Sequence, residues 1–320
     1  MLTSLSDDLA AAVDRAARSI VAIHARPRIA ASGIYWRDGL IVATSHTIRR
    51  EQDIPITLPD GSRGRAQLAG RDSGTDLAIL RLEEPSASRL APDTVSVPEL
   101  APADDLRVGS VVLAVGRPGT DGVSASLGIV SAVGGKWRTW SGGEIDHFVR
   151  LDLSIYDGFS GGALVDAQGR LAGVNCSAIA RGMPLTIPVA TVERVASALL
   201  SGGRVPRGYL GIAMQPVRLG RALSERVGLA AQEGEDGGAR AVLLMSVEPG
   251  SPADRAGLLV GDLLVEIDSH RVTEPGEVAE FLGSDRVGTS LPLSIVRGGE
   301  RRSIDLQVGE RPAERSRPRR

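Results

Sequence analysis

The segment GALVDAQGRLAGV, residues 162–174, consists of two apolar runs on either side of a short turn. Small and polar residues at 167–169 favour a tight turn, so the segment predicts a hairpin of two strands. Short strand-like runs separated by turn residues, such as PDG at 59–61, continue from Ile20 to about Val189. Because no helices alternate with these runs, we expect a mostly β sandwich or barrel and not a parallel sheet.

The composition is that of a globular protein and gives no reason to expect a nucleic-acid partner. The 320 residues are 42% hydrophobic and 24% charged, their formal net charge is -2, and only 3% are aromatic. Neither a basic surface nor aromatic side chains for stacking on bases are indicated. Cys176 is the only cysteine. An intrachain disulfide or a thiolate metal cage is therefore excluded, and we expect neither a metal nor another cofactor.

A helix predicted over about 190–200 ends at Ser201-Gly202-Gly203, which is a typical C-cap and hinge signal. Beyond it, strands with two short helices indicate a small α+β domain. The predicted boundaries are 1–202 for the first domain, including a helix within 1–18, then 203–310 for the second domain and 311–320 for a disordered basic tail.

The location of the protein is predicted from its N-terminal sequence. No apolar run approaches the roughly 20 residues that a membrane span needs. The first residues carry acids where a secretion signal has basic residues. We therefore expect a cytoplasmic protein; the alternative is a periplasmic or extracytoplasmic protein whose export signal is missing from this sequence.

A glycine-rich stretch, GFSGG at 158–162, surrounds Ser160. A nucleophilic serine needs backbone N–H groups that stabilise an oxyanion, and these groups reach a substrate only where side chains are small. We therefore expect Ser160 as a nucleophile and the N–H groups of Gly158 and Ser160 as an oxyanion hole. Taken alone, the stretch is only moderately specific, and the alternative is a glycine-rich β-turn.

Two possible partners of this serine stand at strand ends. His46 follows the apolar run GLIVAT directly, and Asp76 stands at the head of the apolar run LAIL. Alone, His46 is better explained as a core histidine and Asp76 as a residue that caps a strand. Together with Ser160 they occur in the order His, Asp, Ser, which is one of the known orders of a catalytic triad.

The sequence resembles the HtrA (Deg) family of serine proteases. The matching segments, which span Ile20 to Val308, are GLIVATSHTI, GRDSGTDLAILRL, AVGRPG, SLGIVSAV, GFSGGALVDAQGRLAGVN, LTIPVATVERV, RGYLGI and VEPGSPADRAGLLVGDLLVEIDSHRV. The resemblance implies a chymotrypsin-like double β-barrel followed by a PDZ domain. It also implies an endopeptidase of protein quality control and stress response, which cleaves unfolded or damaged polypeptides with Ser160 as nucleophile, His46 as base and Asp76 orienting the imidazole.

The resemblance also implies binding of peptide C-termini by the PDZ domain. The carboxylate would be captured by the backbone of Tyr209, Leu210, Gly211 and Ile212 while the peptide adds to a sheet edge. Val278 and Leu282 have helical spacing and would line the peptide groove. Packing in the domain core explains these two side chains equally well.

The same resemblance implies a substrate preference, and two positions depart from the family pattern. Ser154 occupies the position that is acidic in trypsin, so a preference for Arg or Lys lacks its counter-charge. Ile155 and Cys176 are expected to give the specificity pocket an apolar wall, and a small buried hydrophobe explains Cys176 better than a reactive thiol does. Phe159 and Ala163 replace the usual Asn and Pro. We expect neither change to abolish activity, because the oxyanion donors are backbone groups.

The family resemblance further suggests a homotrimer, for which Tyr35 and Trp36 are the first available aromatic contacts. A competing interpretation is a non-catalytic adaptor or chaperone that binds peptides through the PDZ domain on a degenerate protease scaffold. The presence of all three triad residues argues against this alternative.

Overall fold

The computed structural model describes residues 2–84, 95–101, 105–120, 122–139, 141–180, 183–229 and 238–311. The chain divides into two compact units, residues 1–205 and 206–320. Helix α2 (Val189–Gly202) ends near this division, and Gly203 caps it in the left-handed conformation with a φ of 71°. The predicted end of this helix is therefore confirmed, whereas residues 312–320 of the predicted tail lie outside the described residues.

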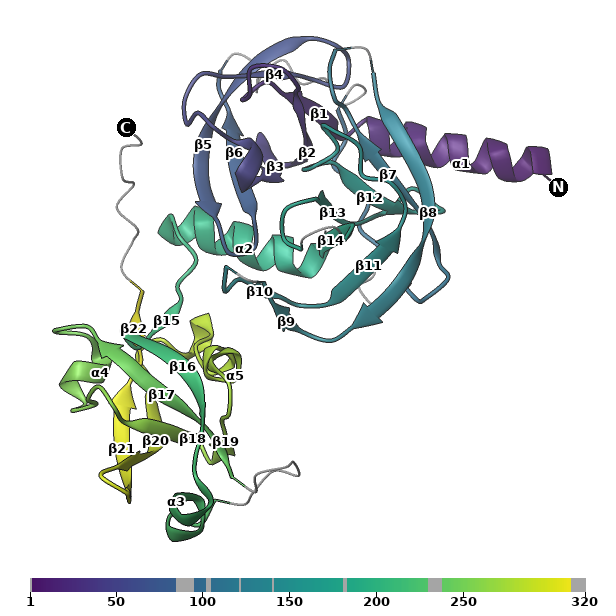
Figure 1. Ribbon diagram of the computed structural model, residues 1–320. Helices are drawn as coiled ribbons and strands as arrows, with labels where there is room; N and C mark the ends of the chain where they lie inside the picture. The colour runs from purple at the N-terminus through teal and green to yellow at the C-terminus, as the bar shows by residue number, and fades with distance from the viewer. Residues whose placement is uncertain are drawn as a thin grey trace. The chain divides into compact units, whose positions relative to one another are not determined.

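The N-terminal unit begins with a closed barrel of strands in the order β1-β2-β3-β6-β5-β4 (Figure 1). In chain order the strands are β1 (Ile20–Ile23), β2 (Ala31–Arg37), β3 (Leu40–Thr44), β4 (Ile54–Thr57), β5 (Arg63–Asp72) and β6 (Leu77–Leu82). All neighbouring strands are antiparallel. A barrel of this kind leaves no free edge for pairing with another chain.

A second closed barrel follows in the order β11-β14-β13-β12-β7-β8. Its strands are β7 (Val111–Gly116), β8 (Ser124–Gly134), β11 (Phe148–Asp152), β12 (Ala163–Asp166), β13 (Leu171–Cys176) and β14 (Leu185–Pro188), with a separate pair, β9 (Trp137–Arg138) and β10 (Glu144–Ile145). Strands β12 and β13 form the hairpin predicted for 162–174. Its turn is closed by Gly169 N–H, which donates to the carbonyl of Asp166 at 2.9 Å. The predicted mostly β double barrel is confirmed.

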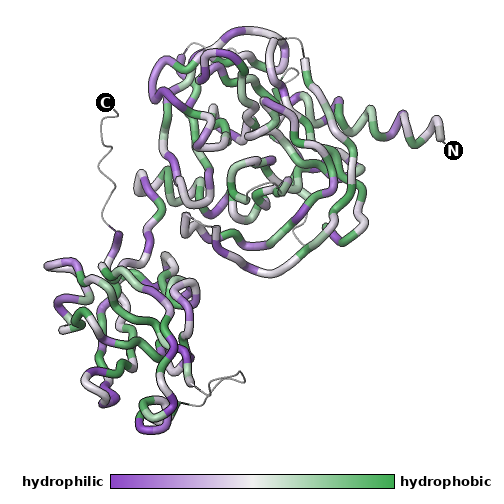
Figure 2. Tube along the Cα trace, in the orientation of Figure 1, coloured by the Kyte–Doolittle hydropathy of each residue, from purple (hydrophilic) through white to green (hydrophobic). Residues whose placement is uncertain are grey.

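Strands β1 and β3 of the first barrel are buried on both faces. In β1, Val21 and Ile23 belong to the core inside the first barrel, whereas Ile20 packs with residues of the second barrel and α2. The burial pattern of β1 and β3 is continuous and does not alternate, which explains why these runs are uniformly apolar. Figure 2 shows the apolar residues concentrated along the strands inside the barrels.

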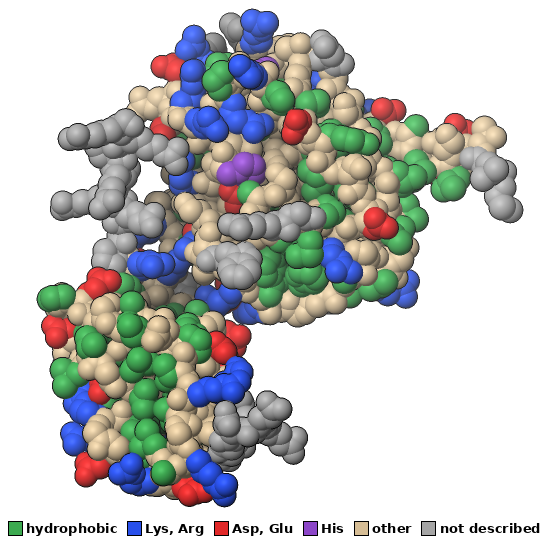
Figure 3. Space-filling view, in the orientation of Figure 1, with side chains coloured by type: hydrophobic (Ala, Val, Ile, Leu, Met, Phe, Trp, Pro, Cys, Tyr) green, Lys and Arg blue, Asp and Glu red, His purple; other side chains and the backbone are tan. Residues whose placement is uncertain are grey.

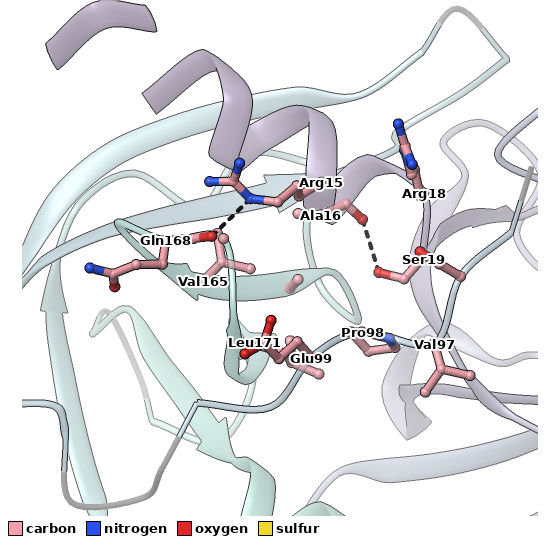
Figure 4. Close-up of a pocket in the computed structure, with 13 residues that line it drawn as sticks. Arg15, Ala16, Arg18, Ser19, Val97, Pro98, Glu99, Val165, Gln168 and Leu171 are labelled. Atoms are coloured by element: carbon pink, nitrogen blue, oxygen red, sulfur yellow. Dashed lines mark hydrogen bonds between the residues drawn. The ribbon is translucent and has the colours of Figure 1, made fainter. Parts of the chain in front are cut away.

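Helix α1 (Leu2–Ala17) projects from the N-terminal unit and packs against it through its C-terminal half (Figure 1). There, Ala12 and Ala16 are buried, and Arg15 Nε donates to the carbonyl of Gln168 at 2.9 Å. Figure 4 shows the pocket of about 200 Å³ beside this contact. It is lined by Arg15, Ala16, Arg18, Ser19, Ser96, Val97, Pro98, Glu99, Ala163, Val165, Gln168, Gly169 and Leu171. Since no triad candidate lines it, we attribute the pocket to the docking of the helix.

The C-terminal unit is an antiparallel sheet in the order β16-β17-β18-β20-β21, with β19 paired to β18 and a separate pair β15-β22. The strands are β15 (Gly208–Tyr209), β16 (Ile212–Arg218), β17 (Arg240–Val247), β18 (Leu263–Ile267), β19 (His270–Arg271), β20 (Ser290–Arg297), β21 (Glu300–Gln307) and β22 (Gly309–Glu310), and the helices are α3 (Arg221–Arg226), α4 (Pro252–Arg255), α5 (Pro275–Glu280) and the 3₁₀ turn η3 (Ser284–Arg286). The predicted α+β class of this unit is confirmed. Across the described residues of both units, no helix is both long and apolar enough to span a bilayer.

Candidate active site

His46 and Asp76 come from adjacent strands of the first barrel. Thr44 at the end of β3 pairs with Leu77 at the start of β6. His46 lies just beyond Thr44, in the 3₁₀ turn η1 (Ser45–Thr47), and Asp76 lies directly before Leu77. The strand register therefore brings the two side chains together at one end of the barrel.

Hydrogen bonds fix Asp76 against His46. Asp76 Oδ1 accepts from the backbone N–H of His46 at 2.8 Å, and Oδ2 accepts from His46 Nδ1 at 2.6 Å. The side chain of Asp76 is only 10% exposed, against 31% for His46. Because a carboxylate only accepts, Nδ1 carries the ring proton and the lone pair of Nε2 is left for a substrate or nucleophile.

Cys176 contacts Asp76 and does not form an open pocket wall. Its side chain is fully buried, and its Sγ donates to Asp76 Oδ2 at 3.0 Å. Burial, reinforced by the charge of Asp76, raises the pKa of the Cys176 thiol, so the thiol stays protonated and remains a donor. The predicted role of Cys176 in the specificity pocket is therefore wrong, since the register of β13 directs its side chain to the triad.

Ligand atoms of His46, Asp76 and Cys176 all lie within 4.8 Å of one another. A tetrahedral zinc ion would hold nitrogen, oxygen and sulfur ligands about 3.3–3.6 Å apart. The His46–Asp76 and Cys176–Asp76 separations of 2.6 and 3.0 Å are shorter than this and suit hydrogen bonds. We therefore interpret the cluster as a hydrogen-bonded unit that orients the imidazole.

Ser160 belongs to the second barrel and lies in the turn that leads into β12. In the described part of the chain, its Oγ shares a hydrogen bond with Ser177 Oγ at 2.9 Å and none with His46. Ser177 directly follows Cys176, which contacts Asp76. Residues 176–177 thus connect the Ser160 hydroxyl to the His46–Asp76 pair, and all three predicted triad residues converge on one end of β13.

The loop before Ser160 presents two unpaired backbone donors. Among the described residues, the N–H groups of Gly158 and Ser160 have no hydrogen-bond acceptor. The peptide group between them is fixed at both ends: the Gly158 carbonyl accepts from Ser32 Oγ at 2.6 Å, and the Phe159 N–H donates to Tyr156 at 3.0 Å. The two free N–H groups are therefore held in place by their rigid neighbour, as an oxyanion hole requires.

The two departures from the family pattern are accommodated by the fold. Phe159 is 1% exposed and stacks edge-on against Tyr156, with ring centroids 5.3 Å apart. Gly116 leaves room for the ring, because a Cβ at that position would lie 2.9 Å from Phe159 Cδ1. Ala163 lies in β12 between Val115 and Val174. Phe159 thus supports the loop from within the core.

Two other predicted pocket residues lie between β11 and residues 156–160, which we call the oxyanion loop. Ser154 is exposed, and its backbone N–H donates to Ser126 Oγ at 3.2 Å. Ile155 is half-buried. Their contribution to substrate preference stays a prediction, and with Cys176 removed from the pocket only Ile155 supplies the apolar wall.

Ser32 and Ser177 contact the candidate site but were not predicted from the sequence. Ser32 on β2 is fully buried and contacts the oxyanion loop across 126 positions of sequence. The only signal in the sequence was a serine within the apolar run around Ile34. Ser177 follows the end of β13 and gave no signal beyond its place after Cys176.

The second unit places four predicted residues at the start of its sheet. Tyr209 ends β15 and its hydroxyl donates to Glu248, Leu210 is buried in the core, Gly211 has a φ of 80°, and Ile212 begins β16. Within the described residues, β16 pairs only with β17, so its other edge is open. An extended peptide can add to such an edge.

The two predicted groove residues differ in exposure. Val278 on α5 is fully buried among core residues of the second unit. Leu282 is half-buried against the same core, just beyond the end of α5. Core packing therefore explains Val278, which is not exposed to a peptide, while Leu282 stays a candidate.

Trp36 was one of two aromatic residues considered for contacts between subunits. It is 4% exposed and packs within the core of the N-terminal unit, and Tyr35 is half-buried against the first barrel. A trimer would therefore need contacts other than Trp36.

Comparisons with known proteins agree with this geometry. Residues 31–174 match the trypsin-like peptidase domain family, and residues 208–308 match the PDZ domain family. Among solved structures, the chain is similar to a serine endoprotease from Yersinia pestis, with 29% identity, a TM-score of 0.70 and coverage of 94% of this chain and 97% of the other. It is also similar to the HtrA-type protease AlgW with a decapeptide, with 27% identity, a TM-score of 0.72 and coverage of 95% and 99%. The chain thus combines a trypsin-like peptidase domain with a PDZ domain, and its resemblance to HtrA proteases is confirmed.

Curated relatives include a probable periplasmic serine endoprotease, DegP-like, from Halomonas elongata. It is 31% identical over 284 residues, which are 87% of this chain and 56% of the relative. The chain thus spans little more than half the length of the curated relatives it matches. Their periplasmic designation contradicts the predicted cytoplasmic location, which rested on the residues at the N-terminus of this sequence alone.

Proposed function

We propose that this chain is a serine endopeptidase of the HtrA type that hydrolyses peptide bonds in unfolded or damaged proteins. Ser160 is the nucleophile, His46 the general base and then acid, and Asp76 the group that orients the imidazole. The observation that carries the proposal is the contact between Asp76 and His46 Nδ1 at 2.6 Å, which leaves Nε2 as a base beside the Ser160 turn.

The reaction follows from the positions of these groups. Ser160 Oγ attacks the peptide carbonyl carbon while His46 Nε2 removes the hydroxyl proton, and the carbonyl oxygen becomes an oxyanion bound by the N–H groups of Gly158 and Ser160. The protonated imidazole then gives its proton to the leaving nitrogen as the C–N bond breaks. A water molecule, deprotonated by the same imidazole, hydrolyses the acyl ester and regenerates the serine.

The hydrogen bond between Ser160 and Ser177 defines the state before substrate binds. Attack requires the Ser160 hydroxyl to leave Ser177 and turn to the imidazole. A single neutral hydrogen bond contributes about 0.5–1.5 kcal/mol, so this rotation is a small part of the barrier to catalysis.

The PDZ domain is proposed to bind the C-termini of polypeptides. Support comes from the open edge of β16 and from the similarity to a protease structure that contains a decapeptide. Bound termini would tether substrates or shift the peptidase domain toward its competent state. We further propose a periplasmic location, supported by the designation of the relatives, and a homotrimer, which size measurement of the purified protein tests.

Labelling with a fluorophosphonate probe tests the catalytic proposal directly. The wild-type chain should be labelled at Ser160 and should degrade unfolded casein, whereas Ser160→Ala should do neither. Binding of C-terminal peptides should be equal in the two proteins. An unlabelled wild-type protein that still binds peptides would be a non-catalytic adaptor.

A further inference from the structure

The end of the first barrel that carries His46 also carries a set of arginines. The strand register places the C-terminal ends of β1 and β3 and the N-terminal ends of β2 and β4 together, since Ile23 pairs with both Ala31 and Ile56. The segments that leave this end are residues 24–30 and 45–53. They contain Arg26, Arg28, Arg49 and Arg50, which we call the arginine rim.

The arginine rim has an excess of positive charge. Arg28, Arg49 and Arg50 are exposed. No ion pair to any rim arginine occurs in the part of the chain that the structure describes. The nearby acids are paired elsewhere: Glu51 with Arg71 at 3.2 Å, and Asp53 with Arg65 at 2.8 Å.

A second sign of incomplete pairing is the guanidinium of Arg26, whose Nε is buried and has no hydrogen-bond partner among the described residues. Figure 3 shows basic side chains gathered over the first barrel, near an exposed histidine. Residues 24–71 contain eight arginines and four acids, although the whole chain has a net charge of -2.

The rim lies on one side of the nucleophile. Ala30 adjoins the oxyanion loop, because its carbonyl oxygen is 2.8 Å from the position that a Cβ on Gly158 would take. The segment that leads into Gly158 carries the exposed acids Asp152 and Asp157, on either side of the predicted pocket residues 154–155. The exposed charges are therefore basic in the segments next to β1 and β2 and acidic in the segment of the predicted specificity pocket.

We propose that the arginine rim binds acidic side chains of the polypeptide substrate on the leaving-group side of the scissile bond. This inference rests on the proposed endopeptidase function. The acyl part of the substrate occupies the pocket at residues 153–157, so the chain after the scissile bond passes the rim. Arginine suits this role because its guanidinium presents several donors to a carboxylate. The acids on the pocket side repel the same carboxylates, which gives the preference a direction.

Fluorogenic peptides that differ only at the second to fourth positions after the scissile bond test the proposal, with the cleavage position verified by mass spectrometry. One peptide carries alanines there, one glutamates and one lysines. Each exposed ion pair is expected to change kcat/KM by about 1.5- to 5-fold. Two pairs therefore predict about a 2- to 25-fold preference for the glutamate peptide over the alanine peptide, and this preference should decline between 50 and 500 mM salt.

Charge reversal supplies the matched comparison. The double variant Arg49→Glu, Arg50→Glu should lose the preference for glutamate or favour lysine. The control is Arg37→Glu, Arg81→Glu, which reverses two exposed arginines where β2 and β6 pair with the start of β3, at the opposite end of the same barrel. It should keep the preference of the wild type.

Two results would overturn the proposal. The first is that the ratio of kcat/KM for the glutamate peptide to kcat/KM for the alanine peptide is the same in the two double variants. The second is that glutamates placed before the scissile bond raise kcat/KM as much as glutamates placed after it. Failure of the endopeptidase function is a different result, in which even the alanine peptide is not cleaved. Binding is therefore also measured with Ser160→Ala by fluorescence anisotropy. The glutamate peptide should bind Ser160→Ala more tightly than the alanine peptide does. Adding Arg49→Glu and Arg50→Glu should abolish this difference in affinity. Equal affinity of Ser160→Ala for the two peptides would also refute the role of the rim.

Discussion

Replacing Ser32 by alanine is expected to weaken the oxyanion hole without touching the triad. Ser32 Oγ joins the two barrels: it donates to the Gly158 carbonyl at 2.6 Å and accepts from the Arg117 backbone N–H at 2.8 Å. Both partners belong to the second barrel, and the Ser32 side chain is fully buried. The variant Ser32→Ala therefore leaves one buried carbonyl and one buried N–H group without partners.

The magnitude of the effect follows from these two bonds. A buried polar group left unsatisfied costs about 1–3 kcal/mol, so the two groups together should lower the free energy of unfolding of Ser32→Ala by about 2–6 kcal/mol. The peptide group after Gly158 also loses the contact that fixes its carbonyl. Removing an oxyanion donor outright lowers kcat by about 10²–10³. Since Ser32→Ala loosens the donors without removing them, kcat should decrease by about 10- to 100-fold, with KM changed less than about threefold.

A matched control exists in the PDZ domain. Ser224 is also buried; its Oγ donates to the Gly220 carbonyl at 3.1 Å and accepts from the Ala239 N–H at 3.0 Å. Ser224→Ala should destabilise its own domain by a similar amount, whereas kcat for a short peptide substrate should equal that of the wild type. Urea unfolding and steady-state kinetics at 20 °C separate the two variants. If Ser32→Ala and Ser224→Ala have the same kcat, the role assigned to Ser32 is refuted.

Replacements at four further positions test other contacts. Asp76→Asn should keep the fold and lower kcat by about 10³–10⁴ in peptide hydrolysis assays, because an amide can donate to the imidazole and so stabilise the wrong tautomer. Cys176→Ser, which keeps a donor to Asp76, should retain activity within about threefold, whereas Cys176→Val should lose about tenfold in the same assay. Ser177→Ala should raise the rate of fluorophosphonate labelling by about two- to tenfold, because the nucleophile loses its resting partner. Gly211→Ala should abolish calorimetric peptide binding and spare hydrolysis of short substrates, since the new Cβ would lie 2.2 Å from Ser251 Cβ at a φ of 80°.

Elements whose structure depends on residues that are adjacent in the sequence could be predicted from the sequence. The hairpin at 162–174 has its turn residues between two apolar runs, and the end of α2 has its glycines at 202–203. His46 and Asp76 each stand beside an apolar run, so their places at strand ends could be predicted from local patterns. The register of β3 and β6, which brings these two strand ends together, is known only from the structure.

Contacts between distant segments could not be predicted in the same way. Cys176 was expected in a pocket wall because an apolar strand does not reveal which neighbour each side chain faces. Its contact with Asp76 spans 100 positions and depends on how the two barrels pack. The same holds for Ser32, whose partners lie 85 and 126 positions away. These residues support the site, and only the tertiary structure shows that they do.

Phe159, the unusual residue before Ser160, shows that the side-chain packing around the site can change while the backbone hydrogen bonds of the turn are kept. Asparagine, which the family usually has at position 159, would place a polar side chain in a site that is 1% exposed here. Phe159 instead fills the space left open by Gly116 and stacks on Tyr156. Its backbone still donates to the Tyr156 carbonyl and accepts from the Gly162 N–H at 2.9 Å. Because the proposed oxyanion donors are backbone groups, the side chain at this position can lie in the hydrophobic core while the turn around Ser160 keeps the hydrogen bonds that shape it.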